Sequence, residues 1–306
     1  MVSPKHLRRG DKIGIVATAR KVTQEHIAPA VEQFKSWGLD VVLSPLLFGG
    51  THSYLAGTDE ERIAAVQQFL DDPEVSAIIC ARGGYGTTRI IDQVDFREFV
   101  KYPKWIVGFS DVTALHLRLS ALGFESIHGT MPVLFTKEDS SSSVEHLRTA
   151  LFGEPLELTT SPHSANRHGE ARGRLIGGNL SLLADSLGTA HEPDTKGAIL
   201  VIEEVDEYYY KIDRMIVQLK RAGKLDHLAG LVGGHFTDIK ETELKFGETV
   251  EEIIRYHTKS FPYPVAFKFP TGHENPNFSW IEGREALLSV DHEQVRLMHS
   301  RLPDQI

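Results

Sequence analysis

The sequence predicts an α/β protein with two domains, and three observations lead to this prediction. In the first half, short apolar runs alternate with segments whose apolar residues recur at helical spacing. The chain has 306 residues, a length that favours two domains over one. A polar stretch without periodicity, SPHSANRHGEARG, interrupts the pattern. We therefore expect a parallel-sheet domain over residues 1–160, a linker over 161–173 and a second domain over 174–306.

In the first domain we expect buried strands at 12–17, 41–43, 77–80 and 105–108. Helices are expected between them. One runs through Val31, Phe34 and Trp37, and another follows the capping-box pattern of Thr58 and Glu61. Strict alternation of strand and helix is typical of a parallel sheet. A run of four serines at 140–143 is expected to form a surface loop.

The second domain is expected to be mixed and richer in short strands. Strands are predicted at 198–202, 231–232, 265–269 and 286–290, and helices at 212–219 and 250–257. The segment GGNLSLLADSLG is expected to be a loop followed by a short helix.

Composition and short motifs argue against several classes of function. The formal net charge of −9 argues against a general nucleic-acid binder. The N-terminus has no long apolar leader segment and no run reaches membrane-spanning length, so we expect a cytoplasmic protein without a membrane partner. The single cysteine, Cys80, excludes an internal disulfide, and its place in a buried strand predicts an inert thiol. No HExxH or CxxC spacing occurs, so we expect no metal and no cofactor.

Ser110 lies where the apolar period changes from strand-like to helix-like. The run 105–108 ends at Gly108, and helically spaced apolar residues begin just after Ser110. Ligands of open α/β sheets bind at the carboxyl ends of strands, where helix N-termini offer N–H donors. Ser110 is therefore either a nucleophile on a tight turn or an ordinary N-cap, and position alone favours the N-cap.

Two other predicted strand ends carry reactive side chains. Glu203 and Glu204 end one strand, and because successive side chains alternate, one should face a site and the other solvent. His273 follows the strand at 265–269. Serine needs a base, and histidine needs a carboxylate to orient it, so the order Ser, Glu, His is compatible with a triad. The pattern does not choose between the two glutamates, and the second glycine of the G-x-S-x-G elbow is missing.

Three further features have alternative interpretations. The turn Gly83–Gly86 is neither G-x-G-x-x-G nor a Walker A loop, so it is either a weak phosphate cradle or an oxyanion hole. His116 is expected to belong to its helix and not to the chemistry. The cluster Tyr208–Tyr210 is expected to serve in packing or at a rim.

Six blocks, taken together and in order, resemble the LD-carboxypeptidase family. They are CARGGYG from Cys80, GFSD from Gly108, HGTMP from His128, GGNLSLL from Gly177, IEEVDEYYYKIDRM from Ile202 and GHENPN from Gly272. The resemblance covers nearly the whole chain. It departs from the family at Phe109, where tyrosine is commoner, and at 280–282, where Trp-Ile-Glu replaces Leu-Pro-Ile.

The resemblance implies a serine peptidase that uses no metal. Ser110 matches the nucleophile, Glu203 the triad carboxylate and His273 the general base. The backbone N–H groups of Gly84 and Asp111 match the oxyanion hole. The implied fold is an N-terminal flavodoxin-like or Rossmann-like domain with a C-terminal swivelling β-rich domain, usually a homodimer, with the active site between the domains.

The expected function is that of a cytoplasmic carboxypeptidase. It would release the terminal D-alanine of murein tetrapeptide during cell-wall recycling, with a murein peptide as its partner and no nucleic acid. One alternative is a microcin C immunity-type hydrolase that cleaves amides of aminoacyl nucleotides. Another is a non-catalytic ligand-binding module that uses the α/β sheet and the Gly83–Gly86 turn.

Overall fold

The computed structural model describes residues 1–50 and 52–300, which form two compact units. The first contains Met1–Glu154 together with Phe278–Trp280, and the second contains Pro155–Asn277 and residues 281–300. The division therefore falls after Glu154 and not within the expected linker.

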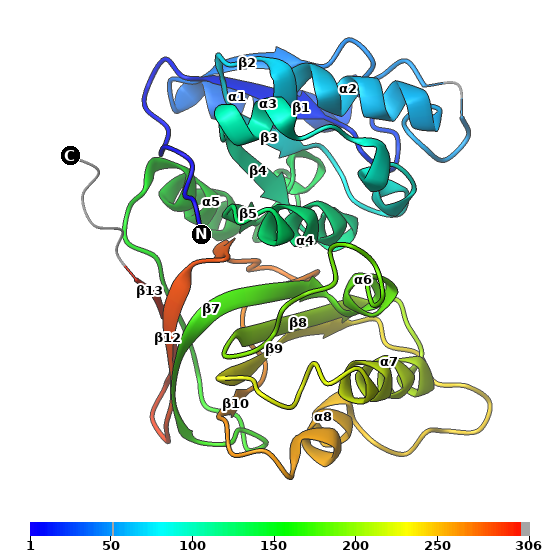
Figure 1. Cartoon of the computed structure of the whole chain (residues 1–306), viewed down its shortest axis with the longest axis vertical. Helices are drawn as coiled ribbons and strands as arrows, with labels where there is room; N and C mark the ends of the chain where they lie inside the picture. Colours follow the sequence, from blue (N-terminus) through cyan, green and yellow to red (C-terminus); the bar gives the residue numbers. More distant parts are fainter. Residues whose placement is uncertain (51, 301–306) are drawn as a thin grey trace. The chain divides into compact units, whose positions relative to one another are not determined.

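The first unit is built on a six-stranded sheet in the order β11-β5-β4-β3-β1-β2. Figure 1 labels its strands β1 to β5. Its strands are β1 (Lys12–Val16), β2 (Asp40–Leu43), β3 (Val75–Cys80), β4 (Trp105–Gly108), β5 (Ser126–His128) and β11 (Trp280–Glu282), of which only Trp280 belongs to this unit. The pairs from β2 to β5 are all parallel, which confirms the predicted sheet. Because β2 lies on one side of β1 and β3 to β5 on the other, the strand order reverses between β1 and β3, as in flavodoxin-like folds.

Five α-helices accompany this sheet: α1 (Gln24–Ser36), α2 (Asp59–Asp71), α3 (Arg97–Lys101), α4 (Thr113–Ala121) and α5 (Ser141–Phe152). The serine run at 140–143 was expected to be a loop, but Ser140 occupies the N-cap position of α5, without a side-chain capping bond, and the other three serines form its first residues. Buried Val144, Leu147 and Leu151 recur at helical spacing and extend the helix back over the serines, whose own preference is weak. None of the helices in 1–50 and 52–300 has the length and apolarity needed to cross a membrane.

The second unit has a seven-stranded sheet in the order β10-β9-β8-β7-β12-β13-β6. Its strands are β6 (Glu157–Thr160), β7 (Gly169–Asn179), β8 (Ile199–Val205), β9 (Gly230–Thr237), β10 (Val265–Ala266), β12 (Glu285–Val290) and β13 (Val295–His299). The four strands from β10 to β7 are parallel, and the rest pair antiparallel. Helix α7 (Tyr209–Arg221) packs against α6 (Leu180–Asp185) and α8 (Val250–Thr258), as Figure 1 shows.

The expected linker is partly strand. Residues 169–173 form the first half of β7 and pair with β12, while β6, which we expected in the first domain, pairs with β13. In this half of β7 only Ala171 and Gly173 are buried, and Glu170 and Arg172 are exposed. An alternation that places only small residues inward has no apolar periodicity, which explains why the sequence pattern suggested a linker.

The predicted capping box at the start of α2 is confirmed. Thr58 Oγ1 accepts from the Glu61 backbone N–H at 3.2 Å, and Glu61 Oε2 accepts from the Thr58 N–H at 2.8 Å. Two N–H groups at the helix end are thereby satisfied.

Replacing Thr58 by alanine should destabilise the first unit. Loss of an N-cap costs about 1 kcal/mol, which lowers Tm by roughly 2–4 °C for a unit of this size. Thermal unfolding followed by circular dichroism measures the change. Thr58→Ser keeps the acceptor oxygen and should retain most of the stability. Equal Tm values for Thr58→Ala and the parent would show that the cap contributes nothing.

Candidate active site

Ser110 has a left-handed backbone conformation, with φ of 63°. It directly follows Phe109 at the end of the β4 segment and begins a 3₁₀ turn, Ser110–Val112, that leads into α4. The residue at the cap position of that turn is Phe109, and no side chain caps it. Ser110 is therefore not an ordinary N-cap. A non-glycine residue with positive φ costs about 1–3 kcal/mol, and such strain concentrates at functional sites.

The backbone at Gly83 lies directly against the Ser110 side chain. A Cβ placed on Gly83 would lie 3.1 Å from Ser110 Cβ and 3.2 Å from Ser110 Oγ. The next residue, Gly84, has φ of 117°, which favours glycine. The loop after β3 therefore brings peptide groups close to the serine hydroxyl, as an oxyanion hole requires.

The Asp111 side chain joins this loop to the Ser110 turn. Its carboxylate is buried and accepts from the backbone N–H groups of Gly86 at 3.2 Å and Thr87 at 2.9 Å. Burial raises the pKa of Asp111, although the hydrogen bonds from Thr87 and Gly86 act in the opposite direction. The residues expected to supply oxyanion donors, Gly84 and Asp111, thus belong to two loops that one carboxylate holds together.

In the second unit, Glu203 and His273 form a close pair. Glu203 lies in β8 and is fully buried, and its Oε2 is 2.6 Å from Nδ1 of His273, which follows β10 in the chain. Burial lowers the pKa of His273, but the charge of Glu203 and this hydrogen bond outweigh burial and raise the pKa above its ordinary 6.5. With Nδ1–H donating to the carboxylate, the neutral ring has its lone pair on Nε2.

Two residues outside the predicted catalytic set support this pair. Gly272 has φ of 124°, and a Cβ there would lie 3.1 Å from both Cβ and Oε2 of Glu203. Its N–H donates to Asn277 Oδ1 at 3.0 Å. The Gly-His block and the asparagine after it are thus the local signal for a loop that must approach a buried carboxylate closely.

Glu204 points to a different environment. Its carboxylate accepts from Asn179 Nδ2, Ser181 N and Ser181 Oγ at 2.7, 2.8 and 2.6 Å. Burial, and then the charge of Glu203, raise the pKa of Glu204. The two glutamates diverge as expected, but the expectation that one faces solvent was wrong, because donors at the start of α6 satisfy the buried Glu204.

The remaining candidates have structural roles. His116 is buried, its Nδ1 is 2.8 Å from Ser126 Oγ and its Nε2 is 2.8 Å from the Gly108 carbonyl oxygen, and burial lowers its pKa to about 4. Burial raises the pKa of the Cys80 thiol to about 12, so the thiol is unreactive. The ring centroids of Tyr208 and Tyr210 lie 5.8 Å apart. Trp280, where the sequence departs from the family, is buried and stacks on His128 at 4.9 Å.

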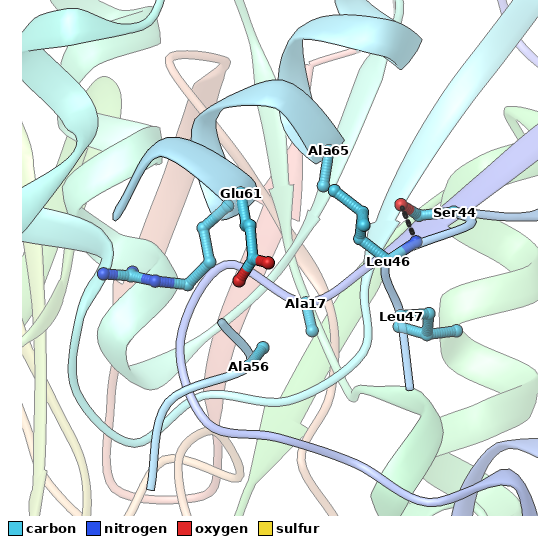
Figure 2. Close-up of a pocket in the computed structure, with 8 residues that line it drawn as sticks. Ala17, Ser44, Leu46, Leu47, Ala56, Glu61 and Ala65 are labelled. Atoms are coloured by element: carbon cyan, nitrogen blue, oxygen red, sulfur yellow. Dashed lines mark hydrogen bonds between the residues drawn. The ribbon is translucent and has the colours of Figure 1, made fainter. Parts of the chain in front are cut away.

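Figure 2 shows a hollow in the first unit. Its polar side chains make hydrogen bonds within the protein. Its lining residues are Ala17, Ser44, Leu46, Leu47, Ala56, Glu61, Arg62 and Ala65. Glu61 belongs to the capping box, and Arg62 donates to the carbonyl oxygens of Thr18 and Gly86 at 2.6 and 2.7 Å. The hollow therefore has a structural role, since Arg62 fixes the far end of the loop after β3.

Both halves of the chain match models of known protein families. The LD-carboxypeptidase N-terminal domain matches residues 13–129, and the LD-carboxypeptidase C-terminal domain matches residues 172–288. The probable murein peptide carboxypeptidase of Bacillus subtilis is 35% identical over 295 residues, 94% of this chain and 91% of the relative.

Solved structures agree with these matches. The crystal structure of muramoyltetrapeptide carboxypeptidase from Oxalobacter formigenes has a TM-score of 0.86 at 28% identity, covering 95% of this chain and 99% of its own. The microcin C7 self-immunity protein MccF, solved with aspartyl sulfamoyl adenosine, has a TM-score of 0.86 over 99% of this chain and 100% of its own. At 21% identity, that second likeness concerns the fold alone. The resemblance read from the sequence is confirmed: this chain belongs to the LD-carboxypeptidase family and is a serine carboxypeptidase.

Proposed function

We propose that this enzyme releases the terminal D-alanine from murein tetrapeptide, with Ser110 as nucleophile, His273 as general base and Glu203 as its carboxylate partner. The observation that carries the proposal is the 2.6 Å hydrogen bond between buried Glu203 and His273, which leaves the basic nitrogen on Nε2. The strained backbone of Ser110 supports its role. The substrate is supported by the Oxalobacter and Bacillus relatives, which are named for murein peptides.

In the first half of the reaction, Ser110 Oγ attacks the carbonyl carbon of the last peptide bond while His273 Nε2 takes the hydroxyl proton. The carbonyl oxygen becomes an oxyanion and accepts from the N–H groups of Gly84 and Asp111, which contribute several kcal/mol to stabilising it. The imidazolium then gives its proton to the leaving D-alanine nitrogen as the C–N bond breaks. An acyl-enzyme on Ser110 remains.

In the second half, His273 takes a proton from water, whose oxygen attacks the acyl carbon. Collapse of this intermediate returns the proton to Ser110 and releases the shortened peptide. Glu203 holds the imidazole tautomer and stabilises the imidazolium in both halves. The proposal includes the cytoplasmic location and homodimeric state that the family resemblance implies, and size-exclusion chromatography with light scattering tests the latter.

Ser110→Ala should reduce D-alanine release from murein tetrapeptide by at least about 10³-fold, because the nucleophile is gone. Chromatographic detection of released D-alanine gives the rate. Circular dichroism should show an unchanged fold. Residual activity within tenfold of the parent would refute the assignment.

A parallel incubation with aspartyl sulfamoyl adenosine, with chromatographic detection of released aspartate, distinguishes the main alternatives. Turnover of that compound in place of the tetrapeptide would make the enzyme an immunity-type hydrolase. Binding of the tetrapeptide without any turnover would indicate a ligand-binding module.

Gly83→Ala should lower kcat strongly while the protein stays folded. The added methyl would lie 3.2 Å from Ser110 Oγ and displace the hydroxyl from its attacking position, and misplacement of about 1 Å can cost roughly 10²-fold. Gly49→Ala is the matched control, since nothing lies within 4 Å of its Cβ position. Equal kcat in Gly83→Ala and Gly49→Ala would show that the contact with Ser110 is irrelevant to catalysis.

The pH dependence of kcat/KM should report the protonation of His273. The base acts unprotonated, so kcat/KM falls as pH drops through its pKa, and that fall should be centred above pH 6.5 because Glu203 raises the pKa. Glu203→Gln removes the charge beside His273, so burial then lowers the pKa of His273 and the fall in kcat/KM should move to lower pH. In the same variant kcat should fall by roughly 10²- to 10⁴-fold.

Glu204→Gln is the control for this profile. It also removes a buried carboxylate charge, but its hydrogen bonds go to Asn179 and Ser181 and not to His273. In this variant the pH at which kcat/KM falls should change much less than in Glu203→Gln. Identical profiles for Glu203→Gln and the parent would exclude His273 as the titrating base.

A further inference from the structure

Two arginines of the first unit lie where the strand order of its sheet reverses. Arg20 comes four residues after the end of β1, and Arg82 two residues after the end of β3. β1 and β3 are parallel neighbours, so their carboxyl ends lie at the same edge. In doubly wound sheets this edge, at the strand-order reversal, forms the crevice that binds ligands.

Both arginines adjoin the proposed catalytic groups. The Arg20 stem lies over Gly84, since a Cβ on that glycine would come within 2.3 Å of Arg20 Cδ. The Arg20 guanidinium lies 4.8 Å from the centre of the Tyr54 ring, which holds its direction. Arg82 immediately precedes Gly83, the residue in contact with Ser110 Oγ.

Arg20 and Arg82 differ from Arg62 and Arg89 in their charge partners. Among residues 1–50 and 52–300, no carboxylate forms an ion pair or hydrogen bond with Arg20 or Arg82, and both are only half-exposed. By contrast, Arg62 and Arg89 both pair with Asp59. Burial, and then the nearby Arg20 charge, lower the pKa of Arg82. Two half-buried like charges without a counter-ion favour binding of an anion.

We propose that Arg20 and Arg82 form a subsite for the C-terminal carboxylate of the peptide, on the residue that leaves. This proposal rests on the proposed function. In such a substrate only one nitrogen and one Cα separate the carboxylate carbon from the carbon that Ser110 attacks, three bonds that together span less than about 4 Å. A cation that binds this carboxylate must therefore lie close to the nucleophile and the oxyanion donors. Arg20 packs on Gly84, and Arg82 directly precedes Gly83, which lies against Ser110.

The subsite would make the enzyme select the end of a chain. Guanidinium groups match a carboxylate with two parallel hydrogen bonds, which a C-terminal amide or a continuing peptide does not provide. Arg20 and Arg82 would thus be specificity residues that restrict cleavage to the terminal bond.

The first test compares murein tetrapeptide with its C-terminal amide. Arg82→Gln and Arg20→Gln should each lower kcat/KM for the acid about 10- to 100-fold, mainly through KM, and leave the slow cleavage of the amide within about threefold. Arg82→Lys should restore part of the loss. Arg89→Gln, on the same loop but paired with Asp59, should match the parent on both substrates. An equal loss on acid and amide would overturn the subsite.

The second test is independent of turnover. The Ser110→Ala variant is titrated with acetyl-D-alanine and with acetyl-D-alaninamide, and binding is followed by ligand-detected NMR. We expect at least tenfold tighter binding of the acid, lost when Arg20→Gln and Arg82→Gln are combined. That result supports the subsite even if murein tetrapeptide is not cleaved, an outcome that would overturn only the proposed function. Equal binding of acid and amide, or a preference that survives the double substitution, would overturn the subsite.

Discussion

The first unit's share of the site depends on one buried carboxylate. Asp111 accepts from the N–H groups of Gly86 and Thr87 and so holds the loop after β3 against the turn after β4. The two parallel strands bring their carboxyl ends to one edge, but strand pairing alone does not determine the path of the loops beyond it. A buried acceptor with two backbone donors does so, because leaving either donor unsatisfied costs about 1–3 kcal/mol.

The left-handed backbone of Ser110 persists because its neighbours are fixed. Phe109 and Val112 are buried on either side of it, and a Cβ on Gly108 would lie 2.8 Å from the Val112 side chain. The chain therefore turns sharply at the serine and has little room to relax. The strain of about 1–3 kcal/mol at φ of 63° is thereby offset by packing, and the hydroxyl is held against Gly83.

The sequence predicted regular elements well where the signal is local. The capping box of Thr58 and the parallel sheet of the first half follow from spacing within about ten residues. It failed at 169–173, where a half-exposed strand uses alanine and glycine as its inward residues. A period-2 pattern without large apolar side chains is not distinguishable from a polar loop.

The same limit applies to the candidate site. Glu203 and Glu204 are adjacent, and only a contact with His273, seventy positions away, distinguishes them. Arg82 belongs to the CARGGYG block, but spacing along the chain does not relate it to Arg20. Their relation arises from the reversal of strand order between β1 and β3. What spacing cannot predict are contacts between residues far apart in the chain, and those contacts distinguish the chemistry of one side chain from that of its neighbour.

Each unit completes its own part of the chemistry locally. The basicity of His273 is set by Glu203 and by a glycine that lets the histidine loop approach it, all within the second unit. The first unit determines the backbone conformation of Ser110 and the position of the peptide groups beside it. It also carries Arg20 and Arg82. Folding of each unit thus compensates the cost of burying the Glu203 charge and of the strained backbone at Ser110. These groups are in place before substrate binds. A transition state that develops charge requires such preorganisation. In the proposed mechanism, recognition of the chain end is assigned to arginines of the first unit and proton transfer to His273 and Glu203 of the second. One function could then change in evolution while the other is kept.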